Sequence, residues 1–302
     1  MEYHNPVLLD ESVSELIHDS SGIYVDCTFG GGGHSREILN RLKEEGKLIS
    51  FDQDEDAQRN LIDDSRFQLV MQNFRYLKNN LRFLKIKKVA GVLADLGVSS
   101  HQFDTPERGF STRFDGELDM RMNQSAKLTA KLILNEYEEE KLAEIFYYYG
   151  ELKNSRRMAK EVVAFRSSQK INSINQLKGI FSYIPKNIEN KFFAQLFQAL
   201  RIEVNDEMAS LREMLMQCGE VIEDGGRLVV ISYHSLEDRL VKRYMKTGMF
   251  EGDPERDVFG NWSAPFKTLQ SKVIVPTAEE IKTNPRARSA KMRIAVKNET
   301  NG

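Results

Sequence analysis

Cysteine, paired histidines and long apolar runs are all scarce in this chain. Its 302 residues include two cysteines, Cys27 and Cys218, and neither belongs to a C-x-x-C motif. A disulfide framework and a thiolate zinc site are therefore excluded, and both side chains are expected to be buried apolar residues. The five histidines show no H-x-x-x-H spacing, so we expect no metal site. No apolar run approaches the ~20 residues of a membrane span and no signal peptide is evident, which favours a cytoplasmic protein.

What is present is a charged, globular sequence with strand and helix patterns in alternation. Apolar residues make up 40% and charged residues 29% of the chain. Short apolar runs at 22–29, 46–54, 67–74 and 88–97 are separated by stretches of helical period, which is typical of a parallel α/β sheet. Further strand signals follow at 227–235, 270–277 and 289–296.

The alternation stops in the middle of the chain. From about Pro106 to Arg201 helical patterns follow one another without a strand between them, and a long helical stretch continues over 190–226. We therefore predict one α/β domain that is split by an all-helical insertion. The predicted domains are 1–105, the first part of the α/β domain; 106–201, the helical insertion; and 202–302, the second part with a basic tail.

Four glycines, Gly30 to Gly33, stand between the first strand and the helical stretch that follows it. A nucleoside triphosphate loop would need G-x-x-x-x-G-K-[ST], and the single Gly-Lys pair, at Gly46, lacks the rest of that motif. A dinucleotide fingerprint would need a third glycine where Ser35 stands, so a nicotinamide cofactor is only weakly supported. The pattern favours a tight turn that lets an adenosine-bearing ligand lie against bare backbone.

Polar and aromatic residues follow the next strands. Asp52 ends the second strand, where its carboxylate could accept hydrogen bonds from the ribose hydroxyls of a ligand. The alternative is that Asp52 is a solvated acid in a turn beside Asp54. We favour the ribose-binding interpretation. Phe74 follows the third strand and could stack on an adenine or cover the core. Asp95 ends the fourth strand. In a doubly wound sheet all of these strand ends face one crevice.

Longer motifs carry a family resemblance. They are "HNPVLLDE" at 4–11, "DCTFGGGGHS" at 26–35, "FDQD" at 51–54, "ADLGVSSHQFD" at 94–104, "RGFS" at 108–111, "DGELDMRM" at 115–122, "ALRIEVNDE" at 199–207, "SYHSLEDRLVK" at 232–242 and "NPRARSAKMR" at 284–293. In these motifs the chain resembles the bacterial RsmH (MraW) family, S-adenosylmethionine-dependent methyltransferases that act on N4 of a cytidine in the decoding region of 16S ribosomal RNA. The resemblance implies a class I, Rossmann-like methyltransferase sheet with a helical insertion after the fourth strand. The cofactor positions that it implies are Gly32, Gly33, His34, Asp52, Phe74, Asp95 and Gln102.

The chemistry of this reaction depends mainly on placement. A sulfonium methyl is already activated, so an amine must be held in line behind it, and acceptors for its N–H groups favour the developing charge. Many amino-methyltransferases use [DNS]-P-P-[YFW] for this, whereas the corresponding residues here read "DLGVSS". The role of Asp95 is therefore open between the cofactor, the amine and both. Methylation of a ring carbon would need a cysteine nucleophile, which carbon-methylating enzymes hold directly after a proline. Neither Cys27 nor Cys218 follows a proline, so methylation of carbon is not expected.

Two neighbouring residues, Tyr233 and His234, follow the fifth strand signal. As catalytic residues, Tyr233 would stack on a flipped cytosine and His234 would orient it or accept a proton. Alternatively they belong to a turn that caps the next helix, with Ser235 as N-cap and Asp238 at the third helical position. The sequence favours neither interpretation.

Positive charge is concentrated in two regions of a chain whose net charge is −2. Residues 153–201 hold ten basic residues and two acids, and residues 282–297 hold six basic residues and no acid. Such runs are usually solvated faces, but two of them suggest contacts with RNA phosphates. The predicted RNA-binding residues are Arg156, Arg157, Lys160, Arg286, Arg288 and Lys291.

The leading prediction is thus an RNA cytosine-N4 methyltransferase whose partner is 16S ribosomal RNA, expected within the 30S subunit. Two alternatives stay open: a nucleotide-dependent oxidoreductase on the same fold, and an RNA-binding ribosome-assembly factor with a vestigial cofactor pocket. Whether the substrate is naked RNA or an assembled particle is open. The oligomeric state is open too, with a homodimer among the options.

Overall fold

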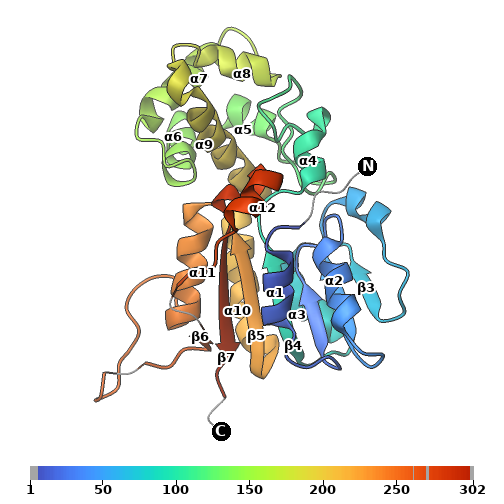
Figure 1. Ribbon diagram of the computed structural model, residues 1–302. Helices are drawn as coiled ribbons and strands as arrows, with labels where there is room; N and C mark the ends of the chain where they lie inside the picture. Colours follow the sequence, from blue (N-terminus) through green and yellow to red (C-terminus); the bar gives the residue numbers. More distant parts are fainter. Residues whose placement is uncertain (1–5, 261, 270–271, 300–302) are drawn as a thin grey trace. The chain divides into compact units, whose positions relative to one another are not determined.

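The computed structural model describes residues 6–260, 262–269 and 272–299. It divides into two compact units (Figure 1). The first unit comprises Met1–Gly97 and Ala209–Gly302, and the second comprises Val98–Met208. The sequence prediction set the ends of the insertion at 106 and 201, several residues inside the second unit. Each unit has its own hydrophobic core.

The first unit contains a sheet in the order β3-β2-β1-β4-β5-β7-β6. Strands β1 to β5 pair in parallel, whereas β7 pairs antiparallel with both β5 and β6. The predicted α/β class is therefore confirmed. The strands are β1 (Ile23–Asp26), β2 (Lys47–Phe51), β3 (Phe67–Val70), β4 (Val89–Asp95), β5 (Ile222–Ser232), β6 (Phe266–Thr268) and β7 (Lys291–Lys297).

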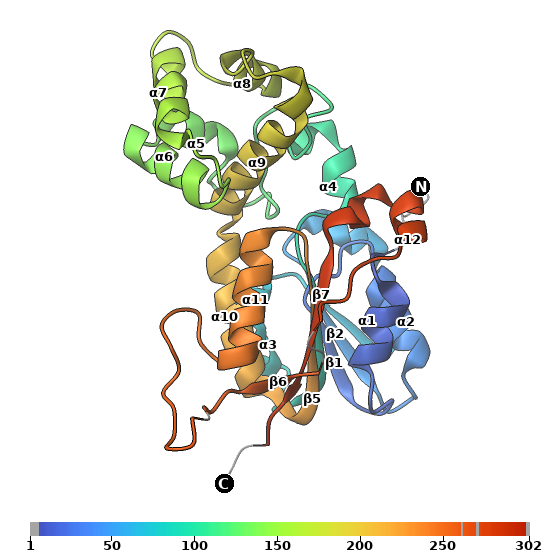
Figure 2. The same cartoon turned by 60° about the vertical axis from the view of Figure 1, so that its left-hand side comes forward.

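Helices cover both faces of this sheet. Helices α1 (Leu9–Leu16) and α2 (Gly33–Arg41) lie on one face, and α3 (Leu77–Phe83), α10 (Glu207–Val221) and α11 (Ser235–Thr247) lie on the other (Figure 2). Because both faces are covered, the central strand β4 reads as a continuous apolar run, VAGVLAD, that is buried up to its last residue. The shorter elements are η1 (Glu55–Asn60), η2 (Phe74–Tyr76), α12 (Ala278–Thr283) and η4 (Pro285–Ser289).

The second unit is helical throughout its named elements. They are α4 (Ser100–Asp104), η3 (Pro106–Arg108), α5 (Ala130–Glu136), α6 (Glu139–Tyr148), α7 (Ser155–Arg166), α8 (Ile174–Ile180) and α9 (Lys186–Asn205). Fully buried Phe146, Leu196 and Leu200 belong to its core. Asp119 and Arg121 form an ion pair, with 2.6 Å between Oδ2 and Nη2. No helix in the described part of the chain is long and apolar enough to cross a bilayer.

Two local predictions differ from the structure, and one strand was not predicted. The helical stretch predicted over 190–226 is divided into α9 and α10 by Asp206, whose φ of +48° no helix tolerates, and its last residues, 222–226, belong to β5. Residues 270–271 of the strand predicted at 270–277 lie outside the described residues, and 272–277 hold an isolated bridge between Ile274 and Met292 instead of a strand. The edge strand β6 has three residues, too few to show an alternating pattern.

Candidate active site

The glycine turn between β1 and α2 has requirements of its own. Gly30 and Gly32 have φ values of +50° and +75°, in the left-handed region that favours glycine. A Cβ on Gly33 would lie 2.1 Å from Cγ of Pro6, closer than any real contact. Backbone conformation and packing therefore explain these glycines before any ligand is considered. The turn also leaves backbone without side chains beside the carboxyl ends of β1 and β2.

Adding a methyl group at Gly33 is expected to destabilise the protein. The Gly33→Ala variant must push Pro6 aside, and overpacking of this kind costs about 1–3 kcal/mol. Gly179→Ala is the matched control, because a Cβ there meets no atom within 4 Å and an alanine inside α8 is favourable. Denaturant unfolding followed by circular dichroism measures both changes. Equal stability of the two variants would contradict the close approach of Pro6.

Asp26, for which no role was predicted, stabilises the glycine turn through hydrogen bonds to the residues on either side of it. It is fully buried at the end of β1. Its Oδ2 accepts a hydrogen bond from Ser35 Oγ at 2.6 Å, and its Oδ1 accepts one from the Thr28 amide at 3.0 Å. Ser35 Oγ lies 2.8 Å from Ser50 Oγ of β2. The serine that replaces the third glycine of a dinucleotide fingerprint therefore links β1, α2 and β2.

Asp52 lies beside the glycine turn, as predicted from its place after β2. Its Oδ2 accepts a hydrogen bond from the Gly30 amide at 2.7 Å, and its Oδ1 accepts one from the Asp54 amide at 2.8 Å. Burial raises the pKa of this carboxyl to about 6. The Asp52 side chain is half-buried. Each of its oxygens accepts one hydrogen bond within the protein and keeps a lone pair for a further donor, such as a ribose hydroxyl.

Three predicted residues meet at the end of β4. Tyr233 Oη donates a hydrogen bond to Asp95 Oδ1 at 2.8 Å, and His34 Nδ1 lies 3.8 Å from Asp95 Oδ2. Burial raises the pKa of Asp95 to about 6, although the His34 ring and the Tyr233 hydroxyl both favour the ionised form. Burial and the nearby Asp95 carboxylate raise the pKa of Tyr233 well above its usual value, so this phenol keeps its proton.

The two ring nitrogens of His34 face different groups. Nε2 lies 3.1 Å from the Val7 carbonyl oxygen, which can only accept, so Nε2 carries a hydrogen. Nδ1 faces Asp95 Oδ2 at 3.8 Å. The contact with Val7 therefore fixes the orientation in which the ring meets the end of β4.

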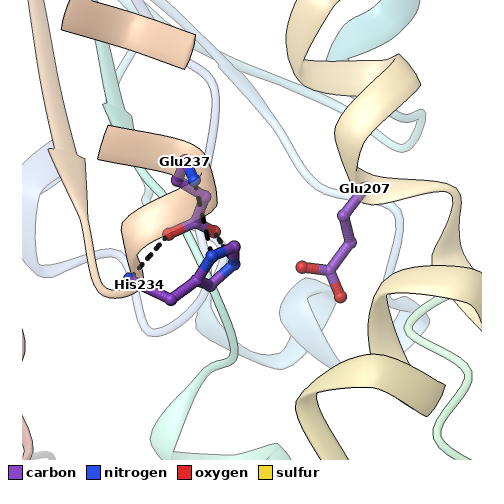
Figure 3. A group of neighbouring side chains, drawn as sticks. All are labelled: Glu207, His234 and Glu237. Atoms are coloured by element: carbon purple, nitrogen blue, oxygen red, sulfur yellow. Dashed lines mark hydrogen bonds and ion pairs between the residues drawn. The ribbon is translucent and has the colours of Figure 1, made fainter. Parts of the chain in front are cut away.

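His234 caps α11, one residue earlier than the predicted cap (Figure 3). Its Nδ1 accepts a hydrogen bond from the Glu237 amide at 3.4 Å. The Glu237 carboxylate in turn accepts from the amides of Tyr233 and His234, at 2.9 and 3.3 Å. The predicted pair of Ser235 and Asp238 was wrong, because buried Glu237 takes the third helical position. A catalytic role of His234 stays a prediction.

The two other predicted cofactor residues have local structural partners. Phe74 opens η2, which Asn73 caps by accepting a hydrogen bond from the Arg75 amide at 2.9 Å, and its ring is half-buried. Gln102 lies in the second unit, buried in α4, where it forms a capping box with Ser99. A contact between either side chain and a cofactor stays a prediction.

The six predicted RNA-binding residues lie in different settings. Arg156, Arg157 and Lys160 are exposed on α7. Arg157 Nε donates to Glu161 Oε1 at 2.8 Å, and its guanidinium lies 4.9 Å from the centre of the Tyr183 ring. In the tail, Lys291 Nζ lies 3.4 Å from Asp238 Oδ2, Arg286 is half-buried and Arg288 is exposed. Exposed ion pairs are weak, so Arg157 can exchange its partner for a phosphate.

The strand order with an antiparallel β7, the glycine turn after β1 and the acids that end β2 and β4 define a class I methyltransferase fold. The chain belongs to the MraW methylase family, whose model matches residues 1–298. A relative named ribosomal RNA small subunit methyltransferase H, from Flavobacterium johnsoniae, is 59% identical over 298 residues, 98% of each chain. One of the same name from Bacteroides fragilis is 58% identical over 296 residues, 98% of this chain and 97% of the relative. The predicted resemblance is confirmed, and the chain is a methyltransferase.

Proposed function

We propose that this methyltransferase transfers the methyl group of S-adenosylmethionine to N4 of a cytidine in the decoding region of 16S ribosomal RNA, within the 30S subunit. The observation that carries the proposal is the Asp95 carboxylate at the end of β4, held by Tyr233 Oη at 2.8 Å in a chain of the MraW family. The names of the relatives support ribosomal RNA as the substrate. Because ribosomal subunits are cytoplasmic, the proposed reaction takes place there. The homodimer stays a prediction.

The residues of the first unit suit S-adenosylmethionine. The cofactor supplies an activated sulfonium methyl group when it is bound. Asp52 offers carboxylate lone pairs to ribose hydroxyls, and the turn from Gly30 to Gly33 offers bare backbone against which the nucleoside can lie. Phe74 provides a half-buried ring for the adenine. The turn lacks the lysine, followed by serine or threonine, that binds the phosphates of a nucleoside triphosphate, which argues against that class of ligand.

The proposed role of Asp95 is to act on the amine. The lone pair of an exocyclic cytosine amine is delocalised into the ring, and a carboxylate that accepts its N–H localises that pair on nitrogen. As the N–C bond forms, the C–S bond breaks and its electrons stay on sulfur. The nitrogen then loses one proton, and Asp95 Oδ2, which faces His34 Nδ1, is the atom proposed to receive it.

Acid is expected to weaken cofactor binding through Asp52. Its pKa is raised to about 6 in the protein, so the carboxylate that accepts ribose hydroxyls is present above pH 6 and is lost below it. Affinity for S-adenosylhomocysteine should therefore fall up to about tenfold for each pH unit below 6. Calorimetric titration from pH 5 to 8 measures this dependence. Asp52→Asn should bind weakly at every pH with a flatter profile, whereas a parent-like profile in that variant would assign the titration to another group.

Tritiated S-adenosylmethionine, incubated with 30S subunits and separately with naked 16S RNA, tests the proposal. Label in the RNA of either substrate supports it, and the preferred substrate identifies the natural one. Cofactor binding without transfer would instead favour the assembly factor. Binding of a nicotinamide cofactor without transfer would favour the oxidoreductase.

A further inference from the structure

A groove of about 420 Å³ lies in the first unit, between α3 and the end of α10. Its apolar lining includes Leu81, Ile86 and Val221, and its cationic lining includes Arg82, Lys85 and Lys87. The volume is within the range of sites for small ligands, about 300–1,000 Å³. An apolar floor with a cationic rim matches a nucleotide, whose base is flat and whose phosphate is anionic.

The segment that forms the rim carries no acid. Residues 78–88 read KNNLRFLKIKK, with five basic residues. Lys78 pairs with the Glu220 carboxylate, and Lys88 Nζ donates to the Glu220 carbonyl at 2.8 Å. The side chains of Arg82, Lys85 and Lys87 are exposed and form no ion pair within the described residues. Three positive charges are thus available to an external anion.

The backbone holds these charges in place. Helix α3 ends in a turn in which the Ile86 amide donates to the Leu81 carbonyl at 2.8 Å and the Lys85 amide donates to the Arg82 carbonyl at 3.0 Å. Lys85 has a φ of +59°, which directs the chain out of the helix and toward β4. Phe83, the last residue of α3, is 84% exposed. An exposed aromatic ring among cations is typical of surfaces on which single-stranded nucleic acid stacks.

This groove lies at the end of the sheet opposite the candidate active site. It adjoins the start of β4 at Val89, whereas Asp95 ends the same strand. Six residue steps along a strand span about 20 Å. The groove therefore cannot contact the reacting base, but it can contact the same RNA some nucleotides away.

We propose that this groove is a second binding site for RNA, which takes one nucleotide and its flanking phosphates outside the reacting region. The inference rests on the proposed function for the identity of the polyanion. Charge complementarity favours RNA: the whole chain has a net charge of −2, yet the lining of the groove holds four basic residues against one acid, Glu220, which pairs with Lys78. The site would increase the affinity for the substrate RNA and orient it, without contributing to the methyl-transfer step.

The test compares the full chain with a triple variant, Arg82→Gln, Lys85→Gln and Lys87→Gln. Fluorescence anisotropy with a labelled single-stranded RNA from the 16S decoding region is measured over a series of salt concentrations. Each lost phosphate contact should lower the slope of log affinity against log salt by about 0.7, so three should lower it by about 2 and weaken binding about 10- to 100-fold near 0.1 M salt. Affinity for S-adenosylhomocysteine and turnover at saturating RNA should not change.

The matched control is Lys43→Gln, Lys47→Gln and Lys246→Gln, which removes three exposed cations of the same unit outside the groove. It should keep the slope of the parent.

Crosslinking of 4-thiouridine RNA to the unmodified protein should mark residues 78–88, a result that does not depend on whether the variant folds. If the folded triple variant still methylates RNA and its salt slope is unchanged, the groove is not an RNA-binding site, although the proposed function stands. Crosslinks confined to other segments would lead to the same conclusion. Groove-dependent binding to phosphatidylserine vesicles with unaltered RNA binding would overturn it in favour of a membrane. A reduced slope in a protein that transfers no methyl group would support the groove and reject the proposed function.

Discussion

Replacing Asp95 by asparagine is expected to lower the rate of methyl transfer by about 10²- to 10³-fold at saturating RNA and cofactor. The amide keeps the shape of the side chain and can still accept from Tyr233 Oη, but it has no charge to favour the developing positive charge on the amine. It also cannot receive the proton that the nitrogen loses. Single-turnover methylation measures the effect, and thermal melting of the isosteric variant shows whether the fold is retained.

The pH profile separates this role from a structural one. The pKa of Asp95 is raised to about 6, so the active carboxylate is lost as pH falls below 6 and the rate of the parent should fall with it. The Asp95→Asn profile should be flat in this range. Tyr233→Phe, which removes one hydrogen bond and keeps the carboxylate, should show a smaller loss of rate. Near-parental turnover of Asp95→Asn would show that "DLGVSS" is a structural turn and that other residues position the amine.

Neutralising the predicted RNA contacts should give the second large effect. Replacing Arg156, Arg157 and Lys160 by alanine is expected to weaken RNA binding about 10- to 100-fold near 0.1 M salt, since each phosphate contact contributes about 0.7 to the salt slope. These side chains are exposed on α7, and removing them leaves no buried group without a partner. Salt titrations of RNA affinity measure the slope, and affinity for S-adenosylhomocysteine serves as the internal control.

The basic tail needs a different set of variants. Lys291 lies 3.4 Å from Asp238, so its removal also disturbs the pair of Asp238 with Arg293. A double variant, Arg286→Ala with Arg288→Ala, spares this pair and should lower the slope by about 1.4. Lys291→Ala alone should then reveal what the ion pair contributes to stability. Parental slopes in both the α7 and the tail variants would identify these charges as solvated faces.

The sequence predicts the sheet and the side chains at its carboxyl edge well, because both depend on short-range patterns. The alternation of apolar runs and helical stretches places Asp52 after β2 and Asp95 at the end of β4, and the structure gives both of them hydrogen-bond partners there. The role of Asp26 was missed, although a carboxylate directly before a glycine turn is a readable signal. Its two partners, Ser35 and Thr28, become evident only when the turn is folded.

Other features depend on geometry that no local pattern reveals. The capping alternative for Tyr233 and His234 put the N-cap of α11 at Ser235, a common capping residue, yet Glu237 can bond the amides of Tyr233 and His234 only if the helix begins one residue earlier. The break between α9 and α10 falls at Asp206; Val204, Asn205 and Asp206 are weak helix formers, but the apolar residues on either side of them continue the helical pattern. The glycine requirement at position 33 comes from Pro6, which is distant in sequence.

The identity of the methylated nucleoside distinguishes methyl transfer to N4 of cytidine from every other RNA methylation. After reaction of the purified protein with S-adenosylmethionine and unmodified 30S subunits, the 16S RNA is digested and its nucleosides are analysed by mass spectrometry. We expect N4-methylcytidine, in an amount that Asp95→Asn reduces by about 10²- to 10³-fold. Methylation on C5 of the base, on a ribose hydroxyl, or on no nucleoside at all would contradict it.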